Sequence, residues 1–187
     1  MTALLVSALV VAIAEIGDKT QLLAIVLATR FNKPVPIVLG IVCATLLNHL
    51  LAATGGYFLA NFLEGNWFRY LIAASFIAVA AWTLLPGKIA EAPAGSDRGA
   101  FLTTLISYFF IETGDKTQIA TIALAARFHS IVLVTAGTTL GVALADGAAI
   151  FLAGKAIQRL PMNTVRAAAA ALFLTLGIWT FADAIQI

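Results

Sequence analysis

Charged residues are scarce in this chain, and their scarcity excludes an ordinary soluble fold. Of its 187 residues, 11% are charged and 61% are hydrophobic, and the mean hydropathy is +1.01. A typical soluble domain has about 25% charged and about 45–50% apolar residues. Because so few charges cannot cover a surface exposed to water, the composition predicts a protein whose solvent is the lipid bilayer.

Cysteine and histidine are nearly absent as well. Cys43 is the single cysteine, which excludes an internal disulfide and a cysteine-rich metal site. The two histidines, His49 and His129, do not stand at metal-ligand spacing, and no HExxH motif occurs. The net charge is +2 and the basic residues are scattered, so nucleic-acid binding has no support. We therefore expect neither an enzyme nor a bound cofactor.

Long apolar runs dominate what is present. A transmembrane helix needs about 20 mainly apolar residues. The candidate runs are Ala3–Thr29, Val35–Phe62, Phe68–Leu85, Phe101–Ala126, Ile131–Ala156 and Val165–Ile185. Residues 87–99, between the third and fourth runs, have the Pro, Gly and charged composition of a linker. The sequence thus predicts an all-α integral membrane protein with six transmembrane helices.

The chain contains one unit twice. Residues 1–86 form a first repeat and residues 100–187 a second, in register at an offset of 97 positions. The motif E-x-G-D-K-T-Q begins at Glu15 and again at Glu112, and the match holds as far as Trp82 and Trp179. Three helices are an odd number, so the second repeat must enter the membrane from the opposite side. This predicts two inverted three-helix repeats, as in many secondary transporters.

The basic residues predict an orientation. Arg69 and Arg127 fall on one side of the predicted membrane, and seven other cations fall on the opposite side. These seven are Arg30, Lys33, Lys88, Arg98, Lys155, Arg159 and Arg166. The positive-inside rule places the side with seven cations in the cytoplasm. Both termini are then expected outside, which is the periplasm if the protein lies in a bacterial inner membrane.

Acidic residues near the middle of the first and fourth apolar runs are the main candidates for function. They are Glu15, Asp18, Glu112 and Asp115. A charge at the centre of a membrane helix costs roughly 2.5–3.5 kcal/mol on insertion scales. Because of this cost, we expect these charged residues to have a function. A glutamate and an aspartate three positions apart share one helix face. Two such faces, brought together by an inverted repeat, would supply oxygen ligands for a divalent cation such as Mn²⁺, Ca²⁺ or Mg²⁺.

Several polar neighbours are possible auxiliary residues. Neutral oxygens for the same ion are available on Thr20, Gln21, Thr117 and Gln118, and Asn48, His49 and Asp146 are polar groups in other predicted helices. These last three could hold the ion's ligands in place or form steps in a proton path, or else make simple polar contacts between helices. Lys19 and Lys116 stand four residues after a motif glutamate and could pair with it. The lysines could alternatively neutralise carboxylates when the cation is absent, or extend toward the interface.

The twin motif, of the form E-x-G-D-K/R-T/S on two three-helix repeats, resembles one family over essentially the whole chain. This is the cation/proton exchanger family that includes bacterial manganese exporters of the MneA type, with Golgi and thylakoid relatives linked to Mn²⁺ and Ca²⁺. The resemblance implies that Glu15, Asp18, Glu112 and Asp115 bind the transported ion. It also implies that protons are the exchanged partner.

The function expected from residues and resemblance together is exchange of Mn²⁺ or Ca²⁺ for protons, with export of Mn²⁺ from the cytoplasm. Crowded carboxylates in a cavity of low dielectric constant would hold protons, and a divalent cation would expel them. Export of a small organic cation or amino acid on a similar fold is the alternative. A scaffold without transport activity is a third class, and it predicts that the carboxylates can be lost without effect. The sequence leaves the oligomeric state open.

Overall fold

The computed structural model describes residues 1–63, 66–85, 99–151 and 161–185, and this part of the chain forms eight α-helices and no strand. The helices are α1 (Thr2–Glu15), α2 (Lys19–Phe31), α3 (Pro34–Phe62), α4 (Asn66–Thr83), α5 (Gly99–Glu112), α6 (Lys116–Phe128), α7 (Ile131–Phe151) and α8 (Met162–Ile185). The expected all-helical class is confirmed for these residues. Four of the cations used above for orientation lie outside the described residues, as do residues 87–98 of the expected linker. These cations are Lys88, Arg98, Lys155 and Arg159.

Three of the described helices have the length and composition of membrane helices. Among the described residues, α3, α7 and α8 are each long and apolar enough to cross a bilayer, and α1, α5 and most of α4 are shorter apolar helices. Large apolar side chains such as Leu51, Phe110, Val132 and Leu144 are exposed on the outside of the molecule. An apolar surface of this extent is covered by lipid in an integral membrane protein.

Each motif interrupts its helix, so the expectation of one continuous helix over Ala3–Thr29 and another over Phe101–Ala126 is wrong. The first of these runs is divided into α1 and α2, and the second into α5 and α6. Gly17 and Gly114 lie in the interruptions with φ angles of +75° and +79°. Only glycine adopts such angles without steric cost, so the motif glycine is what permits the chain to leave one helix and begin the next.

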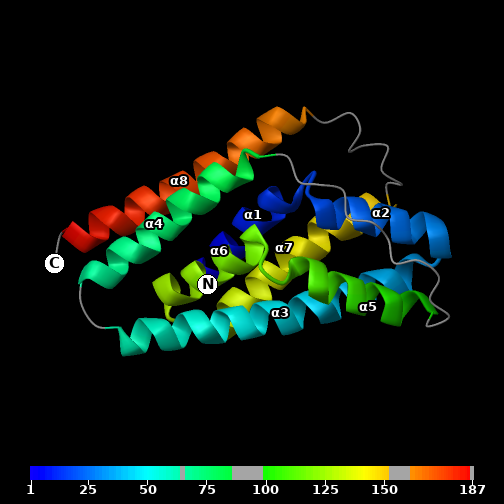
Figure 1. The fold of residues 1–187 in the computed structure, drawn as a ribbon, viewed down its shortest axis with the longest axis horizontal. Coiled ribbons are helices and arrows are strands. Elements are labelled where there is room, and N and C mark those ends of the chain that lie inside the picture. Colours follow the sequence, from blue (N-terminus) through cyan, green and yellow to red (C-terminus); the bar gives the residue numbers. More distant parts are fainter. Residues whose placement is uncertain (64–65, 86–98, 152–160, 186–187) are drawn as a thin grey trace.

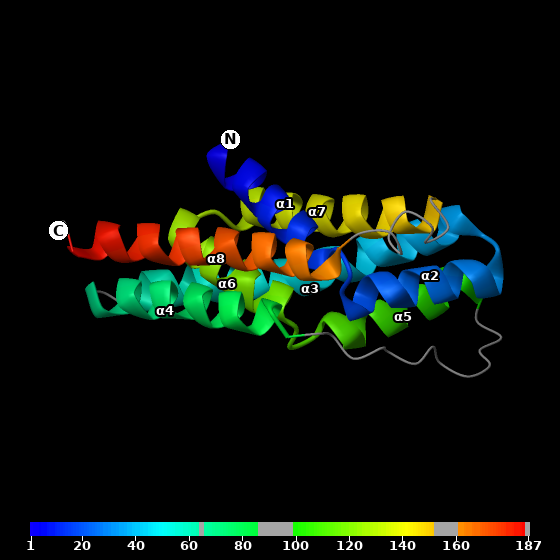
Figure 2. The ribbon, with the colours of Figure 1, turned by 90° about the horizontal axis from the view of Figure 1, so that it is seen from above.

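The two repeats interlock. Figures 1 and 2 show α4 and α8 running side by side, and in Figure 1 the helices α1, α6 and α7 lie between this pair and α3. The most extensive helix pairings are α1 with α7, α4 with α8, α3 with α5 and α3 with α6. Every one of these pairs joins a helix of the first repeat to a helix of the second. The middle of the molecule, where the motifs lie, is therefore built by both repeats.

Equivalent residues make equivalent contacts between the repeats. A Cβ atom on Gly40 of α3 would lie 2.8 Å from the Phe101 carbonyl oxygen of α5, and one on its counterpart Gly137 would meet the carbonyl oxygen of Leu4 of α1. Leu4 and Phe101 are themselves 97 positions apart. These two glycines allow the first half of each interrupted helix to pack closely on the long helix of the other repeat.

Candidate cation site

The motif aspartates begin the second half of each interrupted helix. Asp18 is the N-cap of α2 and Asp115 the N-cap of α6, each with extended backbone and no capping bond from its own side chain. The backbone N–H of each aspartate instead donates 3.0 Å to the carbonyl oxygen of the motif glutamate, Glu15 or Glu112. Because neither carboxylate is engaged in capping, both are free to face the other repeat.

The motif glutamines stabilise the interruptions. The Gly17 N–H donates to Gln21 Oε1 at 2.8 Å, and the Gly114 N–H donates to Gln118 Oε1 at 2.6 Å. A glutamine three positions after the N-cap commonly reaches back to a free N–H at a helix start in this way. The amide nitrogens bind the other repeat: Gln21 Nε2 donates to the Ala145 carbonyl oxygen at 3.0 Å. Gln118 Nε2 donates at 2.9 Å to Oδ1 of Asn48, a residue at the position equivalent to Ala145.

Two crossed ion pairs bring the motifs together. Lys19 Nζ lies 2.9 Å from Asp115 Oδ1, and Lys116 Nζ lies 2.8 Å from Asp18 Oδ1. Each lysine thus binds the aspartate of the other repeat, rather than the glutamate four residues before it in its own repeat. Side chains of the two motifs are therefore in direct contact with one another.

The motif glutamates are buried more deeply than the motif aspartates. Glu15 and Glu112 are 0% and 1% exposed. The Thr20 hydroxyl donates to Glu15 Oε1, and the Thr45 hydroxyl donates to Glu112 Oε1 at 2.6 Å. The second oxygen of each glutamate is buried without a hydrogen-bond partner, and so is Oδ2 of Asp18. Buried carboxylate oxygens are costly unless something binds them, so these atoms mark where a cation or protons would be held.

Two further titratable residues lie close to the motifs. Asp146 of α7 is fully buried, with Oδ2 located 3.2 Å from the Tyr108 hydroxyl and Oδ1 unpartnered. Its charge interacts with those of Glu15, Asp18 and Glu112. His49, at the equivalent position of α3, is fully buried with both ring nitrogens unpartnered, and it lies within electrostatic range of Asp115. The sequence-derived auxiliary residues Asn48, His49 and Asp146 are thus all beside the motifs.

The carboxylates do not form a ready-made metal cage in this arrangement. Within the part of the chain that the structure describes, no three His, Cys, Asp or Glu side chains are grouped so that they could hold a metal ion. The aspartates are occupied by lysines, and Thr117 makes a long contact of 3.5 Å to the other oxygen of Asp115. Ligation of a cation by these groups therefore requires that at least one lysine be displaced or that the carboxylates move together.

Thr45 and Tyr108 were missed by reasoning from the sequence. Thr45 binds Glu112, and the Tyr108 hydroxyl donates to the Thr20 carbonyl oxygen at 2.5 Å. A signal for them existed, because both interrupt the repeat: the equivalents of Thr45 and Tyr108 are Val142 and Val11. A polar side chain in an apolar helix, at a position where the other repeat is apolar, indicates a contact specific to one half of the site.

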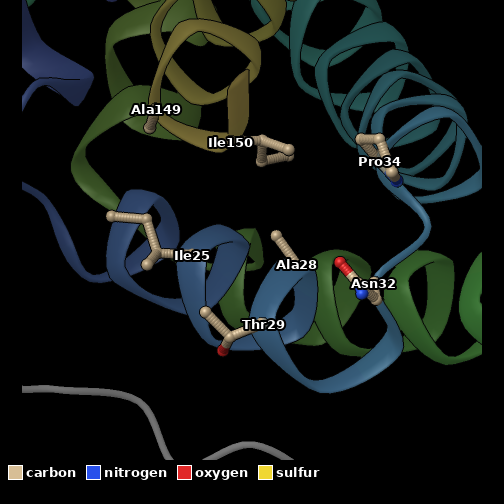
Figure 3. A pocket seen from close by; sticks show the side chains of 7 residues that line it. All are labelled: Ile25, Ala28, Thr29, Asn32, Pro34, Ala149 and Ile150. Atoms are coloured by element: carbon tan, nitrogen blue, oxygen red, sulfur yellow. The ribbon is translucent and has the colours of Figure 1, made fainter. Parts of the chain in front are cut away.

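A pocket of about 190 Å³ lies away from the motifs, between α2, the start of α3 and the end of α7 (Figure 3). Its lining residues are Ile25, Ala28, Thr29, Asn32, Pro34, Ala149 and Ile150. None of these side chains is charged, so the pocket offers no carboxylate to a cation. The crossed ion pairs, and not this pocket, are the candidate site.

Comparison with known proteins agrees with the chemistry of this site. The family model described as "Divalent cation/proton antiporter GDT1" matches residues 3–91 and again residues 100–187, once in each half of the chain. The "Putative manganese exporter" of Vibrio cholerae is 40% identical over 181 residues, covering 96% of this chain and 90% of that protein. "GDT1-like protein 5" of Arabidopsis thaliana is 27% identical, with 89% of each chain covered.

A cyanobacterial relative extends the same pattern. "GDT1-like protein sll0615" of Synechocystis is 27% identical, covering 96% of this chain and 98% of that protein. No solved structure matches the chain. Because the family model covers both repeats and the Vibrio relative aligns over nearly the whole length, this chain belongs to the GDT1 family of divalent cation/proton antiporters, which are transporters and not enzymes.

Proposed function

We propose that this protein exchanges a divalent cation for protons at a site formed by Glu15, Asp18, Glu112 and Asp115. Mn²⁺ is the first candidate for the cation and Ca²⁺ the second. The observation that carries the proposal is the crossed pairing of the two motifs through their aspartates and lysines. Both motif glutamates are buried as well, and three of the four carboxylates keep one oxygen without a hydrogen-bond partner. Hard oxygen ligands in that number suit these ions.

The same carboxylates explain how metal and proton movements are coupled. A proton bound to a carboxylate removes the negative charge that would hold the cation, and a bound cation disfavours the proton. Each ligand therefore expels the other from a shared site. In a protein that alternates between two open sides, this competition becomes exchange.

The arrangement in the membrane is part of the proposal. We treat α1 and α2 together as one interrupted transmembrane span, and α5 and α6 together as another. With α3, α4, α7 and α8, the chain then has six spans. The equivalent contacts of Gly40 and Gly137 support two copies related by inversion. Both termini would then lie in the periplasm of a bacterial inner membrane. A reporter enzyme that is active only in the periplasm, fused after residue 187, tests this orientation and would be inactive if the termini were cytoplasmic.

The choice of Mn²⁺ and the outward direction have separate support. The Vibrio relative has the description "Putative manganese exporter", and in a bacterium the inward proton gradient would drive a cation out. The alternative of an organic cation or amino acid is less well supported. The family match names a divalent cation, and the motif acids are in direct contact with lysine and threonine side chains, an arrangement that suits a small ion.

Transport by the purified protein in proteoliposomes tests the function. We expect Mn²⁺ to accumulate when the pH gradient is imposed in the driving direction, and a pH indicator to report proton movement that depends on Mn²⁺. The same measurement with Ca²⁺ and with Mg²⁺ ranks the three ions by their transport rates. Mn²⁺ flux that neither moves protons nor responds to the pH gradient contradicts exchange, and flux of none of these ions contradicts the substrate class.

A further inference from the structure

The crossed lysines suggest a function beyond charge neutralisation. We propose that Lys19 and Lys116 are built-in competitors of the transported cation: they occupy the motif aspartates while the site is empty and must be displaced when the cation binds. This inference rests on the proposed function, because it presupposes that Asp18 and Asp115 bind the cation.

The geometry of the pairs is the first support. Each ammonium group lies within 3 Å of one aspartate oxygen, at 2.9 Å for Lys19 and 2.8 Å for Lys116. A divalent cation bound to the same carboxylates would lie beside both ammonium groups, and the repulsion would be large at so short a distance in a site with little water. Cation and lysine therefore cannot both hold these aspartates closely.

The charges balance in the two states. Two lysine ammonium groups carry the same total charge as one divalent cation, and both motif aspartates are buried, with side chains 5% exposed. When the cation leaves, the lysines supply an equal positive charge to carboxylates that would otherwise be buried and unpaired. The empty site thus stays compact without a bound metal, which suits a carrier that must return to its starting state.

The two lysines differ in how easily they can withdraw. The side chain of Lys19 is 27% exposed, whereas that of Lys116 is 9% exposed. Lys19 has space outside the site into which its flexible side chain can turn. Lys116 starts α6 and is enclosed, so its release requires α6 itself to shift relative to Asp18 of the other repeat. Displacement of this lysine would in that way connect cation binding to movement of one repeat against the other.

Equilibrium binding of Mn²⁺ to the purified full-length protein tests the inference, with calorimetry at one mildly alkaline pH. We expect Lys19→Gln and Lys116→Gln to bind Mn²⁺ roughly tenfold more tightly than wild type, because a competing charge is gone. Lys33→Gln removes an exposed lysine far from the motifs and should bind as wild type does. Lys19→Arg should bind Mn²⁺ more weakly, because a guanidinium can hold a carboxylate through two bonds.

Transport kinetics add a result that a merely structural lysine would not produce. In proteoliposomes the Lys→Gln variants should show a lower KM for Mn²⁺ together with a lower maximal rate, since the cation is held more tightly and the empty site has lost its counter-charges. Unchanged or weaker Mn²⁺ binding in both Lys→Gln variants, with normal elution in size-exclusion chromatography, overturns the inference. If a glutamine variant does not fold, tighter binding by Lys19→Arg overturns it as well.

Failure of the inference can be distinguished from failure of the proposed function. If the wild type does not bind Mn²⁺, Ca²⁺ or Mg²⁺, or if Asp18→Asn and Asp115→Asn bind as well as the wild type, the proposed site is wrong. A different outcome is that the wild type binds the cation, the aspartate variants lose binding, and the lysine variants bind no more tightly than the wild type. In that case only the competition between lysine and cation is refuted.

Discussion

Each motif acid has a distinct partner, so the four carboxylates differ in what their loss removes. Asp18 and Asp115 bind lysines of the other repeat, whereas Glu15 and Glu112 accept from the hydroxyls of Thr20 and Thr45. At the residue scale, the proposed function requires all four negative charges. A scaffold protein would require none of them.

We expect the isosteric variants to lose transport while the protein remains folded. These are Glu15→Gln, Asp18→Asn, Glu112→Gln and Asp115→Asn, and Mn²⁺ uptake by each should fall at least roughly a hundredfold, since a buried carboxylate ligand to a metal is worth several kcal/mol. Asp183→Asn is the matched control, because that acid pairs with Arg127 on the molecule's surface and is 39% exposed. Wild-type uptake in any two of the four variants would remove the site assignment.

The motif glycines give a second prediction at this scale. Gly114 has a φ of +79°, and a Cβ added there would meet only open space, so Gly114→Ala suffers only the backbone strain, roughly 1–2 kcal/mol. Gly114→Asn should be milder, since asparagine tolerates this conformation better. Gly147→Ala, within α7 and also in open space, should be neutral or slightly stabilising. Thermal unfolding in detergent measures all three, and equal midpoints for the two alanine variants would contradict the account.

Residue patterns predicted much of this site, and their limits have physical causes. The offset of 97 positions correctly indicated that the two motifs meet, because a duplicated sequence builds equivalent contacts such as those of Gly40 and Gly137. The partners of the two lysines were not predictable from their spacing. A separation of four residues favours an ion pair between Lys19 and Glu15 only if both lie in one continuous helix. The helix is interrupted at Gly17. A hydropathy profile does not reveal this interruption, because the profile does not depend on backbone angles. The contacts of Tyr108 and Thr45 lie between the repeats, and only a comparison with their apolar equivalents Val11 and Val142 indicates them in the sequence.

At the scale of helices, the two halves of the molecule are not packed alike. On one side, Gly56 of α3 lies so close to α6 that an added Cβ would collide with the carbonyl group of Ile122. On the other, Ile25 of α2, the equivalent of Ile122, lines the pocket between α2 and α7 (Figure 3). α6 is thus held closely against α3, whereas α2 contacts α7 near Gln21 and is separated from the end of α7 by the pocket.

The close approach of α3 and α6 can be tested with adjacent glycines. Gly56→Ala should destabilise the protein by roughly 1–3 kcal/mol, because the methyl group meets backbone that cannot turn aside. Gly55→Ala is the matched control: its methyl group would contact nothing, and alanine favours the helix by about 0.5–1 kcal/mol over glycine. The midpoint of thermal unfolding should therefore fall for Gly56→Ala and rise for Gly55→Ala, relative to the wild type. Equal stability would mean that α3 and α6 are not in this contact in the protein.

At the scale of the whole molecule, the fold depends on pairings between repeats. α1 packs on α7, α3 packs on α5 and α6, and α4 packs on α8, where the equivalent residues Phe76 and Phe173 are both fully buried. A single repeat would therefore expose the faces that its partner covers. We therefore expect the two repeats to fold as one unit, although residues 87–99 separate them in the sequence.

This interlocking predicts the behaviour of a chain cut within residues 87–99. The two parts, produced together with a tag on one of them, should purify as a complex and transport Mn²⁺, because the helix pairings do not require a covalent connection. Either part alone should aggregate or be degraded. Introducing Gly137→Leu into the second part should abolish capture of the first, since the larger side chain would collide with the Leu4 carbonyl group of α1. Gly147→Ala in the same helix, whose added methyl group would have no neighbour within 4 Å, should leave capture intact. A single repeat that purifies alone as a folded, monodisperse species would contradict this arrangement, and with it the construction of one cation site from both motifs.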